Sequence, residues 1–168
     1  MSRTPDTVPA WLHDNPLGVS ITPADVRDRL DPNLDWEARY RALIALGDLL
    51  PALPDAVRID INRLHGCQAV VWVDHAFDVR TQRLYLSCAT ETRVVAGLLA
   101  CLLNGYNAQT PEVASAFDAK ALVADLELAG HMASERNNGL LAFIGRARML
   151  AHRYGVARRP SPGQHHDA

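Results

Sequence analysis

The possible folds of this chain are limited most by three apolar runs. The first two are separated by a polar turn, and the third, which is strongly apolar, follows them. The first two are AVVWVDHAF at 69–77 and RLYLSC at 83–88. Their strand-like composition and the polar turn between them predict two strands of an antiparallel hairpin, and the second run also alternates apolar and polar residues. Residues 91–104 follow and are apolar on nearly every side of a helix, which is typical of a helix buried by its neighbours. The sequence thus predicts a hairpin followed directly by a buried helix.

Capping residues mark the other expected helices. Thr22, followed by Pro23 and Asp25, predicts a short helix that ends near Leu30. Asp35 predicts the start of a second helix. Apolar spacings of three and four residues predict its buried stripe, which contains Trp36, Tyr40, Leu43, Gly47 and Leu50.

The second half of the chain continues with helices. Starts are expected at Thr110, Asp118 and Ser134, and the helix that begins at Ser134 should run to Tyr154. Between the second helix and the hairpin, residues 57–61 are expected to form a short extended segment. The buried stripe expected for the last helix contains Leu140, Ile144, Ala147 and Ala151.

Length and composition indicate one soluble globular domain. The chain has 168 residues, of which 48% are hydrophobic and 21% charged, so a single core is expected. Residues 19–155 should form this domain. Residues 1–18 are expected to be a mobile arm that docks through Trp11 and Leu12, and residues 156–168 a disordered tail.

Charge and hydropathy bear on location and on the class of partner. The formal net charge of −2 provides no general attraction to nucleic acid or to an anionic membrane. No secretory signal is recognisable and the longest apolar run is too short to cross a bilayer. We therefore expect a cytoplasmic protein with neither a nucleic-acid nor a membrane partner.

The chain has three cysteines, and their settings differ. They form no CxxC pair, and the odd number argues against a disulfide framework. Cys88 and Cys101 fall on apolar faces and are expected to be buried core residues. Cys67 instead follows Gly66 in a polar loop at the mouth of a strand. A loop residue anchored by a rigid strand is a candidate for function.

The residues alone leave three uses for the Cys67 thiol open. It could be a small structural residue. It could bind a metal together with His65 and Cys88, although a structural zinc site needs four converging ligands. It could also be the nucleophile of a hydrolase, with His65, His75 or His131 as the base.

Four segments together resemble the SufE/CsdE family of sulfur-acceptor proteins. The resemblance runs from about Trp36 to Ala151, and its parts are WEARYRALIALGDLLPALP, LHGCQAVVWV, VVAGLLACLLNGYNAQTPEVASAFD and ASERNNGLLAF. The most specific piece is Gly66-Cys67-Gln68 with Val71-Trp72 shortly after it. Ala69 departs from the serine usual in this loop.

The resemblance implies both a fold and a function. The fold is α/β (α+β), with a small antiparallel sheet covered by helices, similar to scaffold proteins of the IscU type. The function is that of a sulfur carrier and activator, not an enzyme. A pyridoxal-phosphate (PLP) dependent cysteine desulfurase of the SufS or CsdA type would place persulfide sulfur on Cys67, for relay to an iron–sulfur scaffold or another acceptor. The PLP would belong to that partner, with no cofactor or metal expected in this chain.

The resemblance also implies roles for six other residues. His65, Gly66 and Gln68 would support the loop. Glu91, Arg136 and Asn138, at the starts of two helices, would contact the desulfurase. The alternative function is that of an IscU-like scaffold that binds a metal or an iron–sulfur cluster itself.

Overall fold

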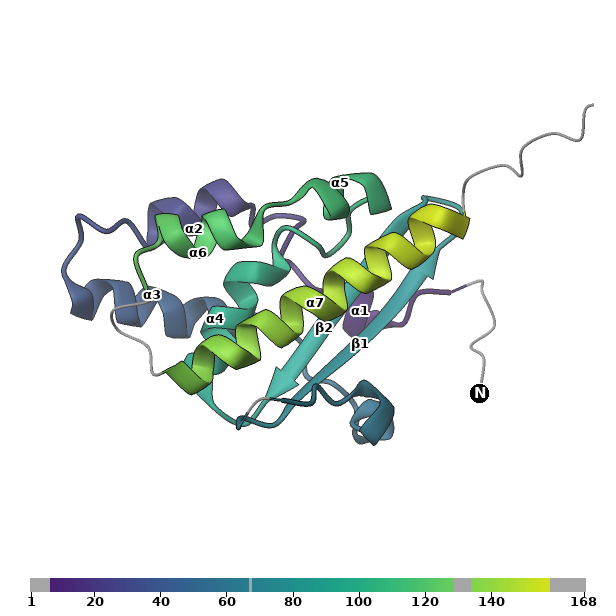
Figure 1. Cartoon of the computed structure of the whole chain (residues 1–168), viewed down its shortest axis with the longest axis horizontal. Coiled ribbons are helices and arrows are strands. Elements are labelled where there is room, and N and C mark those ends of the chain that lie inside the picture. The colour runs from purple at the N-terminus through teal and green to yellow at the C-terminus, as the bar shows by residue number, and fades with distance from the viewer. Residues whose placement is uncertain (1–6, 67, 129–133, 158–168) are drawn as a thin grey trace, which may run out of the picture.

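A two-stranded sheet and the helices around it make up the fold (Figure 1). The computed structural model describes residues 7–66, 68–128 and 134–157, although the side chains of 134–137 are not part of that description. The α-helices among these residues are α1 (Ala10–His13), α2 (Pro23–Arg29), α3 (Trp36–Asp48), α4 (Arg93–Leu103), α5 (Pro111–Ala116), α6 (Ala119–Asp125) and α7 (Ser134–Ala157). The strands are β1 (Val71–Asp78) and β2 (Arg83–Thr90), and two 3₁₀ turns, η1 (Asp55–Val57) and η2 (Asp60–Asn62), precede them.

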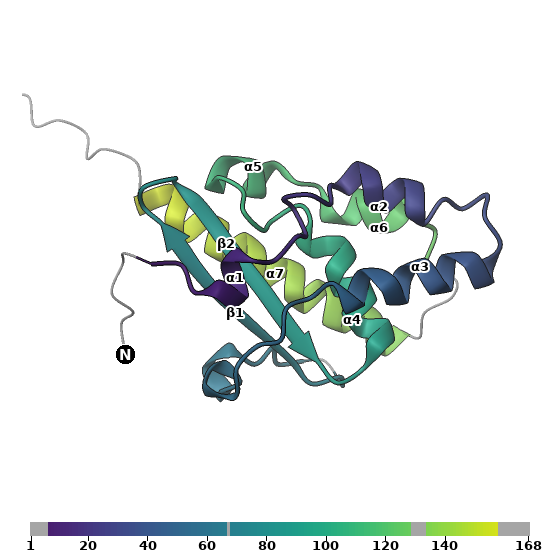
Figure 2. The same cartoon turned by 180° about the vertical axis from the view of Figure 1, so that it is seen from behind.

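The predicted hairpin is confirmed. β1 and β2 pair antiparallel, in a register that runs from Val71 opposite Thr90 to Asp78 opposite Arg83. Helix α7 crosses one face of the hairpin and α1 lies on the other, as the two opposite views show (Figures 1 and 2). The fold class expected from the sequence is therefore confirmed.

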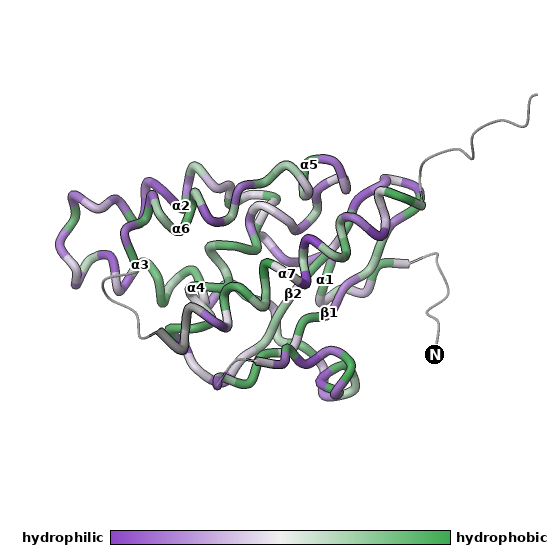
Figure 3. Tube along the Cα trace, viewed as in Figure 1, coloured by the Kyte–Doolittle hydropathy of each residue, from purple (hydrophilic) through white to green (hydrophobic). Residues whose placement is uncertain are grey.

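Helix α4 is the apolar centre of the molecule, as predicted. Every residue from Gly97 to Leu103 is buried. Figure 3 shows α4 as a largely hydrophobic trace among elements of mixed colour. Cys88 on β2 and Cys101 on α4 belong to the same core cluster. In the described part of the chain, no helix combines the length and the hydropathy that a bilayer crossing needs.

Residues 7–18, which the sequence analysis assigned to a mobile arm, are packed against the sheet. Leu12 and Leu17 are fully buried, and the Trp11 Nε1–H donates to Asp74 Oδ2 at 2.7 Å. The expected contact through Trp11 and Leu12 thus exists. Burial of these apolar side chains explains why this segment lies against the hairpin. Residues 1–6 and 158–168 lie outside the described part of the chain.

Most of the predicted helix starts are borne out by cap geometry. Thr22 and Asp25 form a capping box at α2, and Asp35, Thr110 and Asp118 each accept a hydrogen bond from the amide three residues later. Helix α7 begins at Ser134, as expected, and continues to Ala157. Residues 57–61 were expected to be extended, and that expectation was wrong, because η1 and η2 occupy most of this segment.

The buried face of α3 differs from the predicted stripe. Trp36 and Tyr40 are 37% and 42% exposed, whereas Arg39 is buried. The Arg39 guanidinium donates to the carbonyl of Leu30, just after α2, and to that of Leu126, just after α6. Unpaired carbonyls at helix ends are good partners for a cation. Three helices thereby meet at Arg39, and this tertiary contact sets the rotation of α3.

Helices α3 and α4 cross at a pair of glycines. A Cβ on Gly97 would lie 2.3 Å from the Leu43 carbonyl oxygen, and one on Gly47 would lie 2.6 Å from the Gly97 nitrogen. Both distances are below any ordinary contact. The absence of a side chain at these two positions therefore allows the helix backbones to approach so closely.

Buried asparagines hold the N-terminal segment in place. The Asn107 side chain accepts a hydrogen bond from the Leu86 amide and donates one to the Leu17 carbonyl. The Asn15 side chain donates to the Leu86 carbonyl, and the Asn104 side-chain oxygen accepts from the Gly18 amide. The side chains of Asn15 and Asn107 thereby satisfy buried backbone groups of Leu86 and Leu17. They join the N-terminal segment, β2 and the end of α4.

We predict that Gly97→Ala destabilises the protein by about 1–3 kcal/mol, the usual cost of overpacking a core, because its methyl group would meet the Leu43 carbonyl. Urea unfolding followed by circular dichroism measures the change. Gly145→Ala on α7 is the matched control, since a Cβ there has nothing within 4 Å. That substitution should stabilise the exposed helix by about 0.5–1 kcal/mol. Equal effects of the two substitutions would contradict the role of the crossing.

We predict that Asn107→Ala costs about 1–3 kcal/mol for each group that it leaves unpaired, namely the Leu86 amide and the Leu17 carbonyl. The same unfolding experiment measures the loss. Asn33→Ala serves as the control, because Asn33 is exposed and bonds only locally to Asp31. A loss at Asn107 no larger than the loss at Asn33 would refute this assignment.

Candidate functional site

The loop that carries Cys67 is closed at its base by backbone pairing. The Leu64 amide donates to the Val71 carbonyl at 2.8 Å, and Arg63 forms an antiparallel bridge with Trp72. Leu64 is buried at this junction. Cys67 itself lies outside the described residues, but Gly66 before it and Gln68 after it are both exposed. The loop is therefore attached to the sheet at both ends and presents the chain around Cys67 to solvent.

Gly66 is in a conformation that favours glycine. Its φ is +85°, in the left-handed region that most L residues avoid. A Cβ built there would have nothing within 4 Å. The requirement for glycine at this point is thus conformational, since space is available for a side chain.

His65 lies beside the acidic residue of the preceding turn. Its Nε2 is 3.9 Å from Asp60 Oδ1, and both side chains are largely exposed. An exposed ion pair at this distance contributes little to stability. The pairing of His65 with a described residue is therefore a weak one, and the supporting role of His65 stays a prediction, as does that of Gln68.

The turns η1 and η2 form a shoulder next to the loop. The Arg58 guanidinium lies over the Trp72 ring, 5.6 Å from its centroid, and its Nε donates to the Leu53 carbonyl at 3.1 Å. The Asn62 side chain donates to the Val57 carbonyl at 2.7 Å. These contacts hold the shoulder to the first residues of β1.

Two exposed isoleucines on this shoulder were missed by the sequence reasoning. Ile59 is 49% exposed and Ile61 is 77% exposed. The Arg146 guanidinium of α7 donates to the Ile61 carbonyl at 3.4 Å, so the shoulder also touches the last helix. The segment RIDIN at 58–62 contained a signal, since its charged and apolar residues alternate. We expected a short strand there and did not infer an exposed apolar surface.

The structure describes the side chains of two of the three residues that were predicted to contact a partner. Glu91 is exposed and directly follows Thr90, which pairs with Val71 at the end of the Cys67 loop. Asn138 is exposed in the first turns of α7, and the start of α7 lies at the same end of the molecule as the end of β2 (Figures 1 and 2). Arg136 is in the same helix, but its side chain lies outside the described residues.

The other two cysteines lie in the core and ionise poorly. Cys88 and Cys101 are buried, and burial raises the pKa of each thiol from its ordinary value of 9.0 to about 12. For Cys101 a backbone hydrogen bond opposes this effect but does not outweigh it. Both thiols are thus neutral core residues at physiological pH, as expected. Within residues 7–66, 68–128 and 134–157, no three His, Cys, Asp or Glu residues are grouped to hold a metal ion.

Comparison with known proteins places this geometry in a family. A family model described as "SufE: Fe-S metabolism associated domain" matches residues 24–151. The chain is 33% identical over 128 residues to the sulfur acceptor protein CsdE of Escherichia coli K12, a match that covers 76% of this chain and 86% of CsdE. It is also 33% identical to a SufE-like protein of Rhizobium meliloti, over 70% of this chain and 85% of the relative.

A solved structure shares the fold. The solution structure of a hypothetical protein from Thermus thermophilus superposes with a TM-score of 0.62. It covers 89% of this chain and 99% of that protein at 17% sequence identity. At this identity the likeness concerns the arrangement of helices and strands alone.

We predict that iodoacetamide at pH 8 modifies Cys88 and Cys101 very slowly in the native protein. A thiol with a pKa of about 12 has roughly a thousandfold less thiolate at that pH than one at 9.0. The measurement is mass spectrometry of tryptic peptides after timed labelling. The unfolded protein in urea is the control, and equal labelling rates at these two cysteines in both states would contradict their burial.

Proposed function

The chain belongs to the SufE family, associated with Fe–S metabolism, and we propose that it accepts persulfide sulfur on Cys67 from a PLP-dependent cysteine desulfurase. The sulfur then passes to an iron–sulfur scaffold or another acceptor. The observation that carries the proposal is the loop of residues 65–70, which is fastened at its base and exposed on both sides of Cys67. The related CsdE is named a sulfur acceptor protein.

The proposed chemistry is a thiol–persulfide exchange. The Cys67 thiolate attacks the outer sulfur of the desulfurase persulfide, so that a new sulfur–sulfur bond forms on Cys67 and the old one breaks. The desulfurase cysteine leaves as a thiolate. No net oxidation occurs and no electron donor is needed. PLP performs the preceding cleavage of free cysteine in the partner, so the acceptor needs no cofactor of its own.

The distribution of the three cysteines supports a single acceptor. Sulfur transfer requires an accessible thiolate and a nearly linear approach of three sulfur atoms. Cys88 and Cys101 are buried in the core and protonated, so neither meets these conditions. Cys67 lies between exposed neighbours on a loop that can enter another protein's cleft.

The docking surface for the desulfurase surrounds this loop. We assign to it Glu91, Arg136 and Asn138 and add the shoulder residues Ile59 and Ile61. Exposed isoleucines next to polar residues are typical of a protein-contact surface. Binding there would activate the desulfurase by bringing the acceptor thiol to its persulfide. This encounter would take place in the cytoplasm.

The scaffold alternative is less well supported. A protein that holds an iron–sulfur cluster needs several ligands at one place, usually thiolates. Cys88 and Cys101 are instead buried in the core cluster. A Cys-dependent hydrolase would need a fixed histidine base, whereas among the described residues His65 pairs with an exposed carboxylate at 3.9 Å.

We predict that incubation with a SufS- or CsdA-type desulfurase and L-cysteine adds one sulfur atom to the protein. Trypsin separates the three thiols, because Cys67 lies in residues 64–80, Cys88 in 84–93 and Cys101 in 94–120. Mass spectrometry should find the added sulfur in the first of these peptides. Cys67→Ser should fold normally and lose both the sulfur and the stimulation of the desulfurase.

The matched control is the double variant Cys88→Ala with Cys101→Ala, which leaves Cys67 as the sole thiol. It should retain sulfur acceptance and stimulation, although the two core substitutions lower its stability. Retention of both activities by Cys67→Ser, or added sulfur on either of the other peptides, would refute the assignment.

A further inference from the structure

A second candidate site lies on the other side of α7 from the Cys67 loop. It is a cleft of about 290 Å³ between α7 and the segment that joins α5 to α6. The residues that line it are Tyr106, Ser115, Ala116, Phe117, Asp118, Ala119, Lys120, Ile144 and Arg148. None of them belongs to the proposed sulfur-acceptor site.

One of the lining residues, Tyr106, has a buried hydroxyl with an unmet hydrogen-bonding requirement. Tyr106 is fully buried, and its Oη has no hydrogen-bond partner among the described residues. The ring is held edge-on against Phe117 and Phe143, with centroids 5.1 and 6.2 Å away. An unpaired buried hydroxyl is costly and rare in native proteins. A ligand that supplies an acceptor would remove this cost.

The charges around the Tyr106 hydroxyl are predominantly positive. Arg148 and Lys120 are exposed cations on the walls of the cleft, and Asp118 is the one carboxylate among the described lining residues. Burial raises the pKa of Tyr106, Arg148 opposes that rise and Asp118 adds to it. The phenol therefore keeps its proton and can donate, and Arg148 is close enough to act on it.

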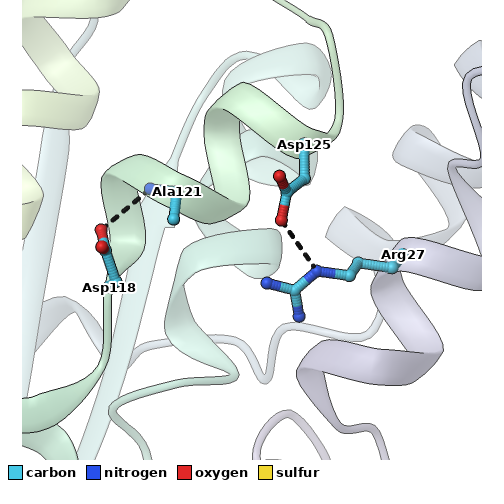
Figure 4. A network of polar contacts seen from close by, with 4 residues as sticks. All are labelled: Arg27, Asp118, Ala121 and Asp125. Carbon is cyan, nitrogen blue, oxygen red and sulfur yellow. Dashed lines mark hydrogen bonds and ion pairs between the residues drawn. The ribbon is translucent and has the colours of Figure 1, made fainter.

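Asp118 is already engaged in capping a helix. Its Oδ1 accepts from the Ala121 amide at 2.9 Å, which holds the first turn of α6 (Figure 4). At the other end of α6, Asp125 pairs with Arg27 of α2 at 3.3 Å, as the same view shows. The α6 wall of the cleft is thus anchored at both ends.

The apolar wall is also fixed. A Cβ on Gly105 would lie 2.1 Å from Phe117 Cδ1, so the Phe117 ring occupies space that only a glycine leaves. Ile144 is buried opposite, on α7. Preformed clefts with an apolar surface and a few convergent polar groups are typical of small-molecule sites.

We propose that this cleft binds a small organic carboxylate. The carboxylate would pair with Arg148 and Lys120 at the surface of the cleft. It would also accept a hydrogen bond from the Tyr106 hydroxyl, which is covered here and becomes reachable when a lining side chain moves. The carbon chain would lie against Phe117 and Ile144. A charged acceptor suits a buried donor better than a neutral one does, and the volume of about 290 Å³ is sufficient for a small organic ligand.

This site is separate from sulfur transfer. Arg146 and Arg148 are two residues apart on α7, so they point to different sides of the helix. Arg146 reaches the shoulder at Ile61, while Arg148 lines the cleft. Ligand binding in the cleft is therefore independent of the role of Cys67.

The test is an NMR titration of the ¹⁵N-labelled full chain with butyrate. Two comparison compounds are titrated in the same way. Butyramide is the neutral analogue of the same size, and inorganic phosphate is an anion without a carbon chain. Butyrate should cause saturable shifts of the amides around residues 116–120 and 144–148. Neither butyramide nor phosphate should do so to the same extent. Absence of saturable butyrate shifts, or equal shifts with either comparison compound, would overturn the proposal.

Two variants separate binding from folding. Tyr106→Phe removes the unpaired hydroxyl, so it should melt no lower than the wild type, yet bind butyrate at least about tenfold more weakly. Arg148→Gln, at an exposed position, should weaken binding similarly, whereas Arg153→Gln, outside the cleft on the same helix, should not. The site would be refuted if both Tyr106→Phe and Arg148→Gln bound butyrate with unchanged affinity. If Tyr106→Phe unfolds, the butyrate affinity of Arg148→Gln alone is the test.

Discussion

The hydrogen bonds of Asn107 hold together parts of the chain that are far apart in sequence. One side chain bonds both to β2, at the Leu86 amide, and to the N-terminal segment, at the Leu17 carbonyl. A hairpin of two strands has few partners of its own and is marginal in isolation. Here the backbone of β2 at Leu86 is satisfied by Asn15 and Asn107. The outer edge of β2 is thus satisfied by side chains at Leu86 and by the backbone of Gln109 at Leu84, where a larger sheet would use another strand.

The helical layer depends on a second close contact. Because Gly47 and Gly97 have no side chains, α3 and α4 meet at backbone distance, and α4 is buried on nearly all sides. Arg39 then joins the ends of α2 and α6 to α3 through their carbonyls. A buried guanidinium is costly unless its donors are satisfied, so these contacts restrict how α3 rotates. The exposure of Trp36 and Tyr40 follows from that restriction.

The burial of two of the three cysteines follows from this architecture. The hairpin and α4 enclose Cys88 and Cys101, and desolvation suppresses their ionisation. The loop around Cys67 leaves the sheet at Leu64 and returns at Val71, and its residues Gly66 and Gln68 are exposed. A rigid base with an exposed tip suits a group that must be presented to another protein. The family role in Fe–S metabolism is consistent with this arrangement.

The sequence alone determined the hairpin, the buried helix and the helix caps at Thr22, Asp35, Thr110 and Asp118. Strand alternation and helix capping depend on residues close together in the chain. The motif around Cys67 likewise identified the family from sequence. Only the tertiary structure decided that residues 7–18 cover the hairpin, that Arg39 is buried in place of Trp36, and that Ile61 is exposed beside the loop. It alone brought Tyr106 and Arg148 to one cleft. These features depend on contacts between residues distant in the chain, which no local pattern specifies.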